Sequence, residues 1–164
     1  MTIFVKNKHT LQIDEFKFKC CIGKNGSTRY KKEGDKKTPK GTFEVENLYF
    51  RKDRLAKPLT LIKCIEIKKD MGWCDDLSFP KKYNKLFKIE KKIKHEKLKR
   101  KDNKYDFLIP IKYNFKKPVT GKGSCIFIHL TKDYKPTAGC IALKKKDFLI
   151  MLKLIKKKTK IKIF

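Results

Sequence analysis

Short stretches in which apolar and polar residues alternate make up much of the chain, and this pattern predicts β-strands. Residues 16–20 alternate with a period of two, which is typical of a half-buried strand. Residues 159–164 alternate in the same way and predict a closing strand of the edge type. Short apolar runs bounded by turn residues predict further strands at residues 2–5, 11–13, 43–50, 59–67, 105–111 and 112–115.

The clearest helical pattern begins at Lys144. Apolar residues recur there at i, i+3, i+4 and i+7, which places them on one face of a helix: Phe148, Met151, Leu152 and Ile155. Residues 87–101 have only weak helical spacing among many lysines, and they predict a solvated loop or a short helix. Many short strands with one late helix predict a mainly β fold, a β-sandwich or open barrel with the helix following Cys140.

The length of 164 residues suits a single domain, and no repeat or linker divides the chain, so residues 1–164 are expected to form one unit. The net charge of +28 favours an anionic partner, such as nucleic acid or a membrane surface. The excess is almost all lysine, however, and an A+T-rich coding bias would produce the same composition. Few arginines are present to form bidentate phosphate contacts, so nucleic acid is not the expected partner.

Six cysteines occur, none of them in a CxxC pattern or near a histidine at zinc-ligand spacing, so no metal site is expected. The first sixteen residues lack the apolar segment of a signal peptide. No run approaches the roughly 18 apolar residues that span a membrane, so no transmembrane segment is expected. A cytoplasmic location therefore stays open.

The candidate chemistry lies between residues 125 and 143. One apolar run ends at His129, a polar turn follows, and Gly139-Cys140 precedes a second apolar run. This order brings an imidazole to face a thiol, and the imidazole can take the proton to give an ion pair with the nucleophilic thiolate. Gly139 admits a substrate carbonyl close to the chain, and the N–H groups of Gly139 and Cys140 are expected to stabilise an oxyanion. A buried cysteine and an unrelated histidine are the alternative on spacing alone.

Three sets of segments resemble the L,D-transpeptidase catalytic domain, the YkuD family. Ile128-His129-Leu130 and Thr137-Ala138-Gly139-Cys140-Ile141-Ala142-Leu143 are similar to its pattern of a His at a strand end, a loop, and Ser/Thr-x-Gly-Cys. Thr38-Pro39-Lys40-Gly41-Thr42-Phe43 looks like its amino-terminal TPxGxF signature. Gly72-Trp73-Cys74-Asp75-Asp76, Tyr83-Asn84 and residues 123–129 look like the branch that lacks the longer His-Gly loop, so the resemblance spans almost the whole chain.

Three positions depart from the family pattern. Ala138 stands where many members have His, Leu130 where Gly is common, and Ala142 where many have Arg. A guanidinium at the last position could hold a donor carboxylate, so its loss bears on substrate choice.

The resemblance implies a cysteine acyltransferase in which Cys140 is the nucleophile, His129 the base and then the acid, and Gly139 part of the catalytic turn. It implies Thr137, Trp73, Asp76, Tyr83 and Asn84 as substrate-binding residues, although the stretch around Trp73 could equally be a core anchor beside a solvated turn. The implied substrates are peptidoglycan stem peptides. Attack on a meso-diaminopimelate–D-alanine bond releases D-alanine, and an amine of a second stem peptide completes an L,D (3-3) cross-link.

The same resemblance implies a bacterial enzyme of peptidoglycan synthesis that acts in cell wall organisation and cell shape, in the periplasm or cell envelope. It implies a monomer without a cofactor that forms a covalent adduct with carbapenems. Resolution of the acyl-enzyme by water would instead make the protein an L,D-carboxypeptidase or another amide hydrolase. A basic binding module for nucleic acid or anionic surfaces is the second alternative.

Overall fold

The computed structural model describes residues 1–164, and its largest element is a sheet of ten strands. These strands are β1 (Thr2–Lys6), β2 (Thr10–Ile13), β3 (Phe16–Cys21), β6 (Gly41–Glu44), β7 (Leu48–Phe50), β8 (Cys64–Glu66), β12 (Phe107–Pro110), β13 (Phe127–Leu130), β14 (Ile141–Leu143) and β15 (Lys160–Ile163). Their order in the sheet is β6-β15-β1-β2-β3-β14-β13-β12-β7-β8. Two smaller sheets join β9 (Met71–Cys74), β10 (Leu86–Lys88) and β11 (His95–Lys97), and β4 (Ser27–Thr28) with β5 (Thr38–Pro39).

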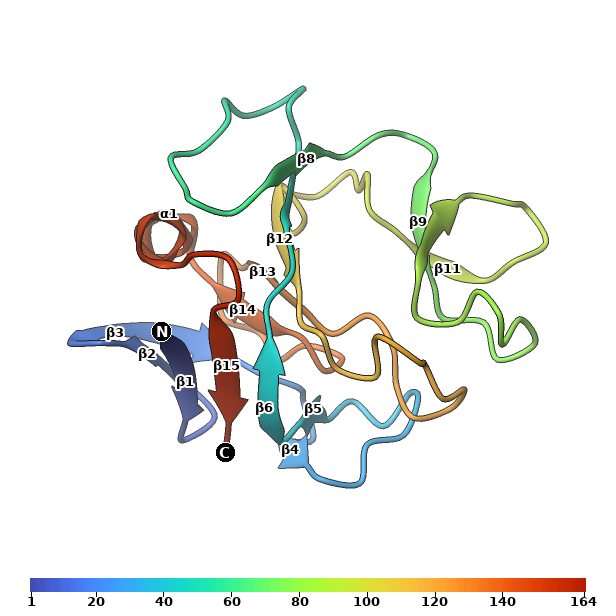
Figure 1. The fold of residues 1–164 in the computed structure, drawn as a ribbon, viewed down its shortest axis with the longest axis horizontal. Helices are drawn as coiled ribbons and strands as arrows, with labels where there is room; N and C mark the ends of the chain where they lie inside the picture. The colour runs from blue at the N-terminus through green and yellow to red at the C-terminus, as the bar shows by residue number, and fades with distance from the viewer.

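The large sheet curls back on itself. Just past β6, Val45 forms a β-bridge to Ile111, which follows β12, although six strands lie between β6 and β12 in the order of the sheet. The bond from Lys112 N–H to Glu44 O, 2.8 Å long, joins the same two segments. The fold is therefore mainly β and barrel-like, as the sequence predicted. The sheet of β9, β10 and β11 lies to one side of this curl (Figure 1).

The single helix α1 (Lys145–Leu154) packs against the inner face of the curled sheet, above β1, β2 and β3 in Figure 1. The apolar stripe predicted from the sequence is confirmed, because Phe148, Met151, Leu152 and Ile155 are all fully buried. They join strand residues such as Ile3 and Leu11 in a core of 25 buried residues. Ten residues are too few for the helix to cross a bilayer, and no helix here is long and apolar enough to do so.

The prediction of an edge strand at residues 159–164 is wrong in its place in the sheet. β15 lies between β6 and β1 and runs parallel to β1, with Ile161 paired to Ile3. Alternation reports only that one face of a strand is buried. It does not tell whether one or both edges are paired, so the pattern was right about the strand and wrong about its neighbours.

Three other stretches differ from their predicted elements. Residues 59–67 form a strand only at Cys64–Glu66, while Leu59 and Leu61 are 77% and 73% exposed. Residues 43–50 divide between two strands, β6 and β7, and residues 112–115 form no strand. A short apolar run in the sequence does not by itself show whether the residues pair in a sheet, so these strand boundaries were overextended.

Residues 87–101 were expected to be a solvated loop or a short helix, and the loop is confirmed for residues 89–94 and 98–101, but the two strands in the stretch were missed. The stretch holds the end of β10 and the whole of β11, which both pair with β9. Ile93 and Leu98 are buried. Many lysines can lie on the solvent side of such short strands, so a high lysine content did not exclude pairing.

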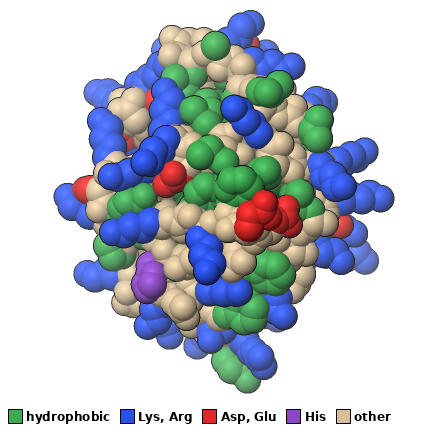
Figure 2. All heavy atoms as spheres, turned by 90° about the vertical axis from the view of Figure 1, so that its left-hand side faces the viewer, with side chains coloured by type: hydrophobic (Ala, Val, Ile, Leu, Met, Phe, Trp, Pro, Cys, Tyr) green, Lys and Arg blue, Asp and Glu red, His purple; other side chains and the backbone are tan.

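Lysine and arginine side chains cover much of the face shown in Figure 2, with hydrophobic side chains between them. Ion pairs can neutralise only part of the positive charge of these side chains, because the chain has 45 basic residues and 17 acidic ones. The surface is therefore strongly cationic.

Candidate active site

Two neighbouring parallel strands, β13 and β14, bring His129 and Cys140 to the same place. His129 lies in β13 and pairs with Ala142 of β14, and Cys140 precedes Ala142 by two residues. Paired residues and residues two apart on a strand point to the same face of a sheet. Because the strands are parallel, residues 131–140 form a crossover loop that returns to the same end of the sheet, where the sequence suggested a tight turn.

Both side chains line one cleft of about 540 Å³. Thr137 and Ala138 line it on the side of the crossover loop, and Tyr105 lines it on the side of the segment before β12. The thiol and the imidazole therefore share a single opening. This is the condition for the acyl-transfer chemistry expected from the sequence.

The His129 ring is held by its own chain and by an aromatic neighbour. Nδ1 lies 2.9 Å from the backbone oxygen of Leu130, and because a carbonyl can only accept, Nδ1 carries the proton. Nε2 is then the nitrogen with the free lone pair, as a general base requires. Tyr105 packs against the ring with centroids 5.3 Å apart and an interplanar angle of 68°. Burial lowers the pKa of His129 to about 4, and the charges of Lys104 and Arg100 act in the same direction.

The Cys140 thiol is buried and hydrogen-bonded to backbone groups. Sγ donates to the carbonyl of Cys125 at 3.1 Å and accepts from the N–H of Phe127 at 3.4 Å. Burial raises the pKa of the thiol to about 12, and the Phe127 N–H opposes this only in part. With the pKa of His129 lowered, both groups are neutral at pH 7. The ion pair expected from the sequence is therefore not the resting state, and no hydrogen bond joins the two side chains at rest.

The turn before Cys140 requires glycine. Gly139 has φ of +142°, and a Cβ built there would lie 2.9 Å from the backbone oxygen of Lys37. Thr137 Oγ1 accepts from Gly139 N–H at 3.0 Å and donates to Cys140 O at 2.6 Å, which closes the turn. Gly139 N–H is thus already engaged, whereas Cys140 N–H is bonded to no protein acceptor. Of the two amides expected to stabilise an oxyanion, the one at Cys140 is free to do so.

Thr38, from the amino-terminal signature, stabilises this turn through hydrogen bonds. Its hydroxyl donates to Gly139 O at 2.8 Å and accepts from Gly23 N–H at 2.9 Å. Gly23 in turn forms a β-bridge with Thr137. The two sequence motifs, whose bonded residues Thr38 and Gly139 are 101 positions apart, therefore meet in one structural unit.

Trp73 and Asn84, predicted to bind substrate, lie outside the cleft. Trp73 Nε1 donates to Asn84 Oδ1 at 2.9 Å, and Asn84 Nδ2 donates to the carbonyl of Tyr113 at 3.1 Å. Trp73 is almost fully buried against Phe127. Both predicted residues line a separate hollow of about 250 Å³, and their contact with substrate stays a prediction.

Tyr83 and Asp76 also do not line the cleft, and both are occupied by structural hydrogen bonds. The Tyr83 hydroxyl bonds to Glu33 and accepts from Gly123 N–H at 3.1 Å. Asp76 accepts from the N–H groups of Ser78 and Lys94, both at 2.9 Å. A substrate role for these two residues likewise stays a prediction, while Thr137 does line the cleft.

The segment from residue 96 to residue 105 contributes four cleft residues that sequence reasoning missed. Arg100 lies over the Tyr105 ring, 5.0 Å from its centroid, and bonds to Glu96 at 2.8 Å. Lys104 also lines the cleft. No motif marked this segment, because its nearness to His129 arises only when β12 pairs with β13.

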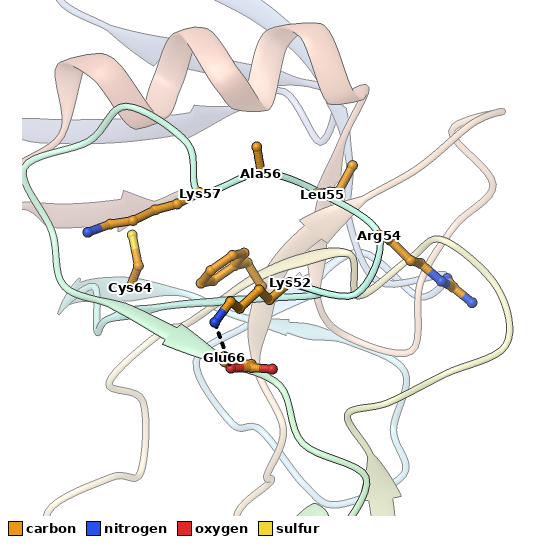
Figure 3. Close-up of a pocket in the computed structure, with 8 residues that line it drawn as sticks. Lys52, Arg54, Leu55, Ala56, Lys57, Cys64 and Glu66 are labelled. Atoms are coloured by element: carbon orange, nitrogen blue, oxygen red, sulfur yellow. Dashed lines mark ion pairs between the residues drawn. The ribbon is translucent and has the colours of Figure 1, made fainter.

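A larger hollow of about 650 Å³ lies elsewhere, between the loop at residues 52–57 and β8 (Figure 3). Lys52 pairs with Glu66 across it at 3.8 Å. Cys64 lines it as well, but no histidine does, and burial raises the pKa of that thiol. This hollow therefore lacks the pair of groups that acyl transfer needs.

Comparisons with known proteins give a matching family and a similar fold. The family described as the L,D-transpeptidase catalytic domain, YkuD, matches residues 1–163. Among solved structures, that of Bd1075 from Bdellovibrio bacteriovorus is similar with a TM-score of 0.51 and 17% sequence identity. The similarity covers 99% of this chain and 47% of that one, so the present chain spans about half the length of its relative, and the likeness concerns the fold alone. No curated protein matches the chain.

Proposed function

The chain belongs to the YkuD family of L,D-transpeptidase catalytic domains, and from this premise we propose that it is a cysteine acyltransferase that forms L,D (3-3) cross-links between peptidoglycan stem peptides. The observation that carries the proposal is the shared cleft of Cys140 and His129, with the imidazole oriented by Leu130 O. The chemistry uses only side chains and backbone groups of this chain.

In the first half-reaction, Cys140 Sγ attacks the carbonyl of a meso-diaminopimelate–D-alanine bond. The thiol turns from the Cys125 carbonyl toward the imidazole, and its proton passes to His129 Nε2 as the C–S bond forms. Cys140 N–H donates to the oxyanion of the tetrahedral intermediate. His129 then gives the proton to the departing nitrogen, the C–N bond breaks, and D-alanine leaves a thioester on Cys140.

In the second half-reaction, an amine of another stem peptide attacks the thioester. Its proton passes to His129 Nε2, the C–S bond breaks, and the proton returns to the sulfur. A new amide bond links the two peptides, and the neutral resting pair is restored. Both half-reactions need an imidazole that is unprotonated at pH 7, and the lowered pKa of His129 provides it.

The proposal is tested by the intact mass of the protein after incubation with a stem tetrapeptide. We expect the wild type to gain the mass of the acyl group without D-alanine, and Cys140→Ser to gain no thioester. His129→Gln should form the thioester about 10²–10⁴-fold more slowly, the range for loss of general acid–base catalysis. A carbapenem should label the wild type and not Cys140→Ser. Absence of any adduct on the wild type would contradict the proposal.

The products separate transfer from hydrolysis. With an acceptor peptide present, a cross-linked dimer is expected. Formation of tripeptide alone, with and without the acceptor, would instead identify an L,D-carboxypeptidase. The substrate places the reaction in the cell envelope, where we propose that the protein acts, as a monomer, in peptidoglycan synthesis and in the maintenance of cell shape.

A further inference from the structure

Lys104 lies at the junction of the catalytic cleft and a second hollow. Its backbone oxygen accepts from Leu130 N–H at 2.9 Å, which places it beside the strand that carries His129. The second hollow has a volume of about 470 Å³ and shares Lys104, Leu130, Thr131 and Asp133 with the cleft, so the two adjoin. A bound peptide that passes from one to the other would pass Lys104.

The other two cations that line the catalytic cleft are already paired. Arg100 bonds to Asp102 at 2.7 Å and to Glu96 at 2.8 Å. Lys135 pairs with Asp133 at 3.2 Å. The Lys104 ammonium has no carboxylate within 4.0 Å, and its side chain is exposed. Lys104 is therefore the cation in this cleft that can take a new anionic partner without breaking an existing ion pair.

The reaction places an anion near this ammonium. His129 must deliver a proton to the nitrogen of the leaving residue, so that residue lies on the imidazole side of Cys140. Its terminal carboxylate is only two bonds from that nitrogen. Ala142, which pairs with His129 and lines the cleft, has a small side chain that leaves room there. Lys104 lines the cleft together with His129, and its charge acts on the imidazole, so the unpaired ammonium lies on the same side.

On the basis of the proposed function, we propose that Lys104 binds the terminal carboxylate of the leaving residue, and that the enzyme thereby selects donor peptides that end at that residue. A charge-assisted bond between an ammonium and a carboxylate is a strong polar contact in proteins. A peptide that is extended or amidated at this position presents no anion to Lys104. Such a donor would still enter the cleft, but it would gain no binding free energy from Lys104.

The test compares two tetrapeptide donors, one with a free terminal carboxylate and one with a terminal carboxamide. The rate of thioester formation is followed by intact mass over a range of donor concentrations. For the wild type, we expect about tenfold or greater preference for the free carboxylate, the size of one charged hydrogen bond. Lys104→Ala should lose this preference by slowing the reaction of the carboxylate donor alone, and Lys104→Arg should keep much of it.

Lys132→Ala is the matched control, because Lys132 is also exposed and unpaired but lines only the second hollow. This variant should prefer the carboxylate donor over the carboxamide donor as strongly as the wild type does. A change in rate common to both donors would report an effect of Lys104 on His129, whereas a change confined to the carboxylate donor reports binding.

Two results would overturn the inference while leaving the proposed function intact. One is a wild type that reacts equally well with both donors, and the other is a Lys104→Ala variant that keeps the full preference. A wild type that forms no thioester with either donor would instead contradict the proposed function, and the inference with it. Thermal unfolding of each variant shows whether it is folded.

Discussion

At the scale of single residues, the two reactive groups of the site, the Cys140 thiol and the His129 imidazole, are both uncharged at rest. Cys140 and His129 are 8% and 6% exposed, and burial disfavours the charged form of each. The thiol is held by backbone partners until substrate enters the cleft. Proton transfer is thereby tied to attack on a carbonyl, because burial disfavours a thiolate in the empty site.

This neutral pair predicts slow alkylation of Cys140 at neutral pH. With its pKa raised to about 12, the thiol has very little thiolate at pH 7, and the thiolate fraction grows about tenfold for each pH unit up to that pKa. The rate of iodoacetamide labelling at Cys140, measured by peptide mass, should therefore rise steadily from pH 7 to pH 10. His129→Gln should give a similar curve. A rate that is already maximal at pH 7 would show a pre-formed ion pair and contradict this expectation.

At the scale of elements, the site depends on segments that are distant in the sequence. The parallel pairing of β13 and β14 sets the face on which His129 and Cys140 lie. The segment around Thr38 then holds the turn at Gly139 through one hydroxyl. The amino-terminal signature is thus a support for the nucleophile and makes no contact with the cleft itself.

Replacement of Thr38 by valine should destabilise the fold. Thr38 is fully buried, and the change leaves Gly23 N–H and Gly139 O without their partner. Loss of these bonds should lower the free energy of unfolding by about 3 kcal/mol, the sum for two buried groups left unsatisfied. Urea unfolding measures this, and thioester formation should slow as the turn loosens. Thr42→Val, in the same signature but exposed, is the control and should change the free energy of unfolding by less than about 0.5 kcal/mol.

At the scale of the whole molecule, the charge is the dominant feature. A net charge of +28 on 164 residues places many like charges on one compact surface. Such self-repulsion destabilises the compact state. Salt screens it, since the Debye length falls from about 30 Å at 0.01 M to about 8 Å at 0.15 M ionic strength.

Added salt should therefore raise the melting temperature. Each kcal/mol of reduced repulsion corresponds to about 2–4 °C for a chain of this size. Thermal unfolding at 0.01 M and 0.15 M NaCl measures the shift, and Cys140→Ala should show the same dependence because the charge is unchanged. A melting temperature that falls with salt would mean that the surface ion pairs outweigh the repulsion.

The sequence by itself determined the elements whose periodicity reflects one buried face. The stripe from Phe148 to Ile155 predicted α1, and alternation predicted β3 and β15 as strands. When one face of an element is buried, its apolar residues recur every 3.6 residues in a helix and every 2 in a strand, whatever the element packs against. The motif around Gly139-Cys140 identified the nucleophile and its histidine as candidates. These features depend on local geometry, which the order of residues carries directly.

Only the tertiary structure decided which elements are neighbours and what that does to their chemistry. The interior place of β15, the parallel pairing of β13 with β14, and the meeting of Thr38 with Gly139 arise from long-range pairing, which leaves no periodic trace in the sequence. The neutral state of Cys140 and His129 follows from their burial, and the place of Lys104 beside the cleft follows from β12 joining β13. Charge states and open cleft positions depend on surroundings in three dimensions, and those surroundings exist only once the chain has folded.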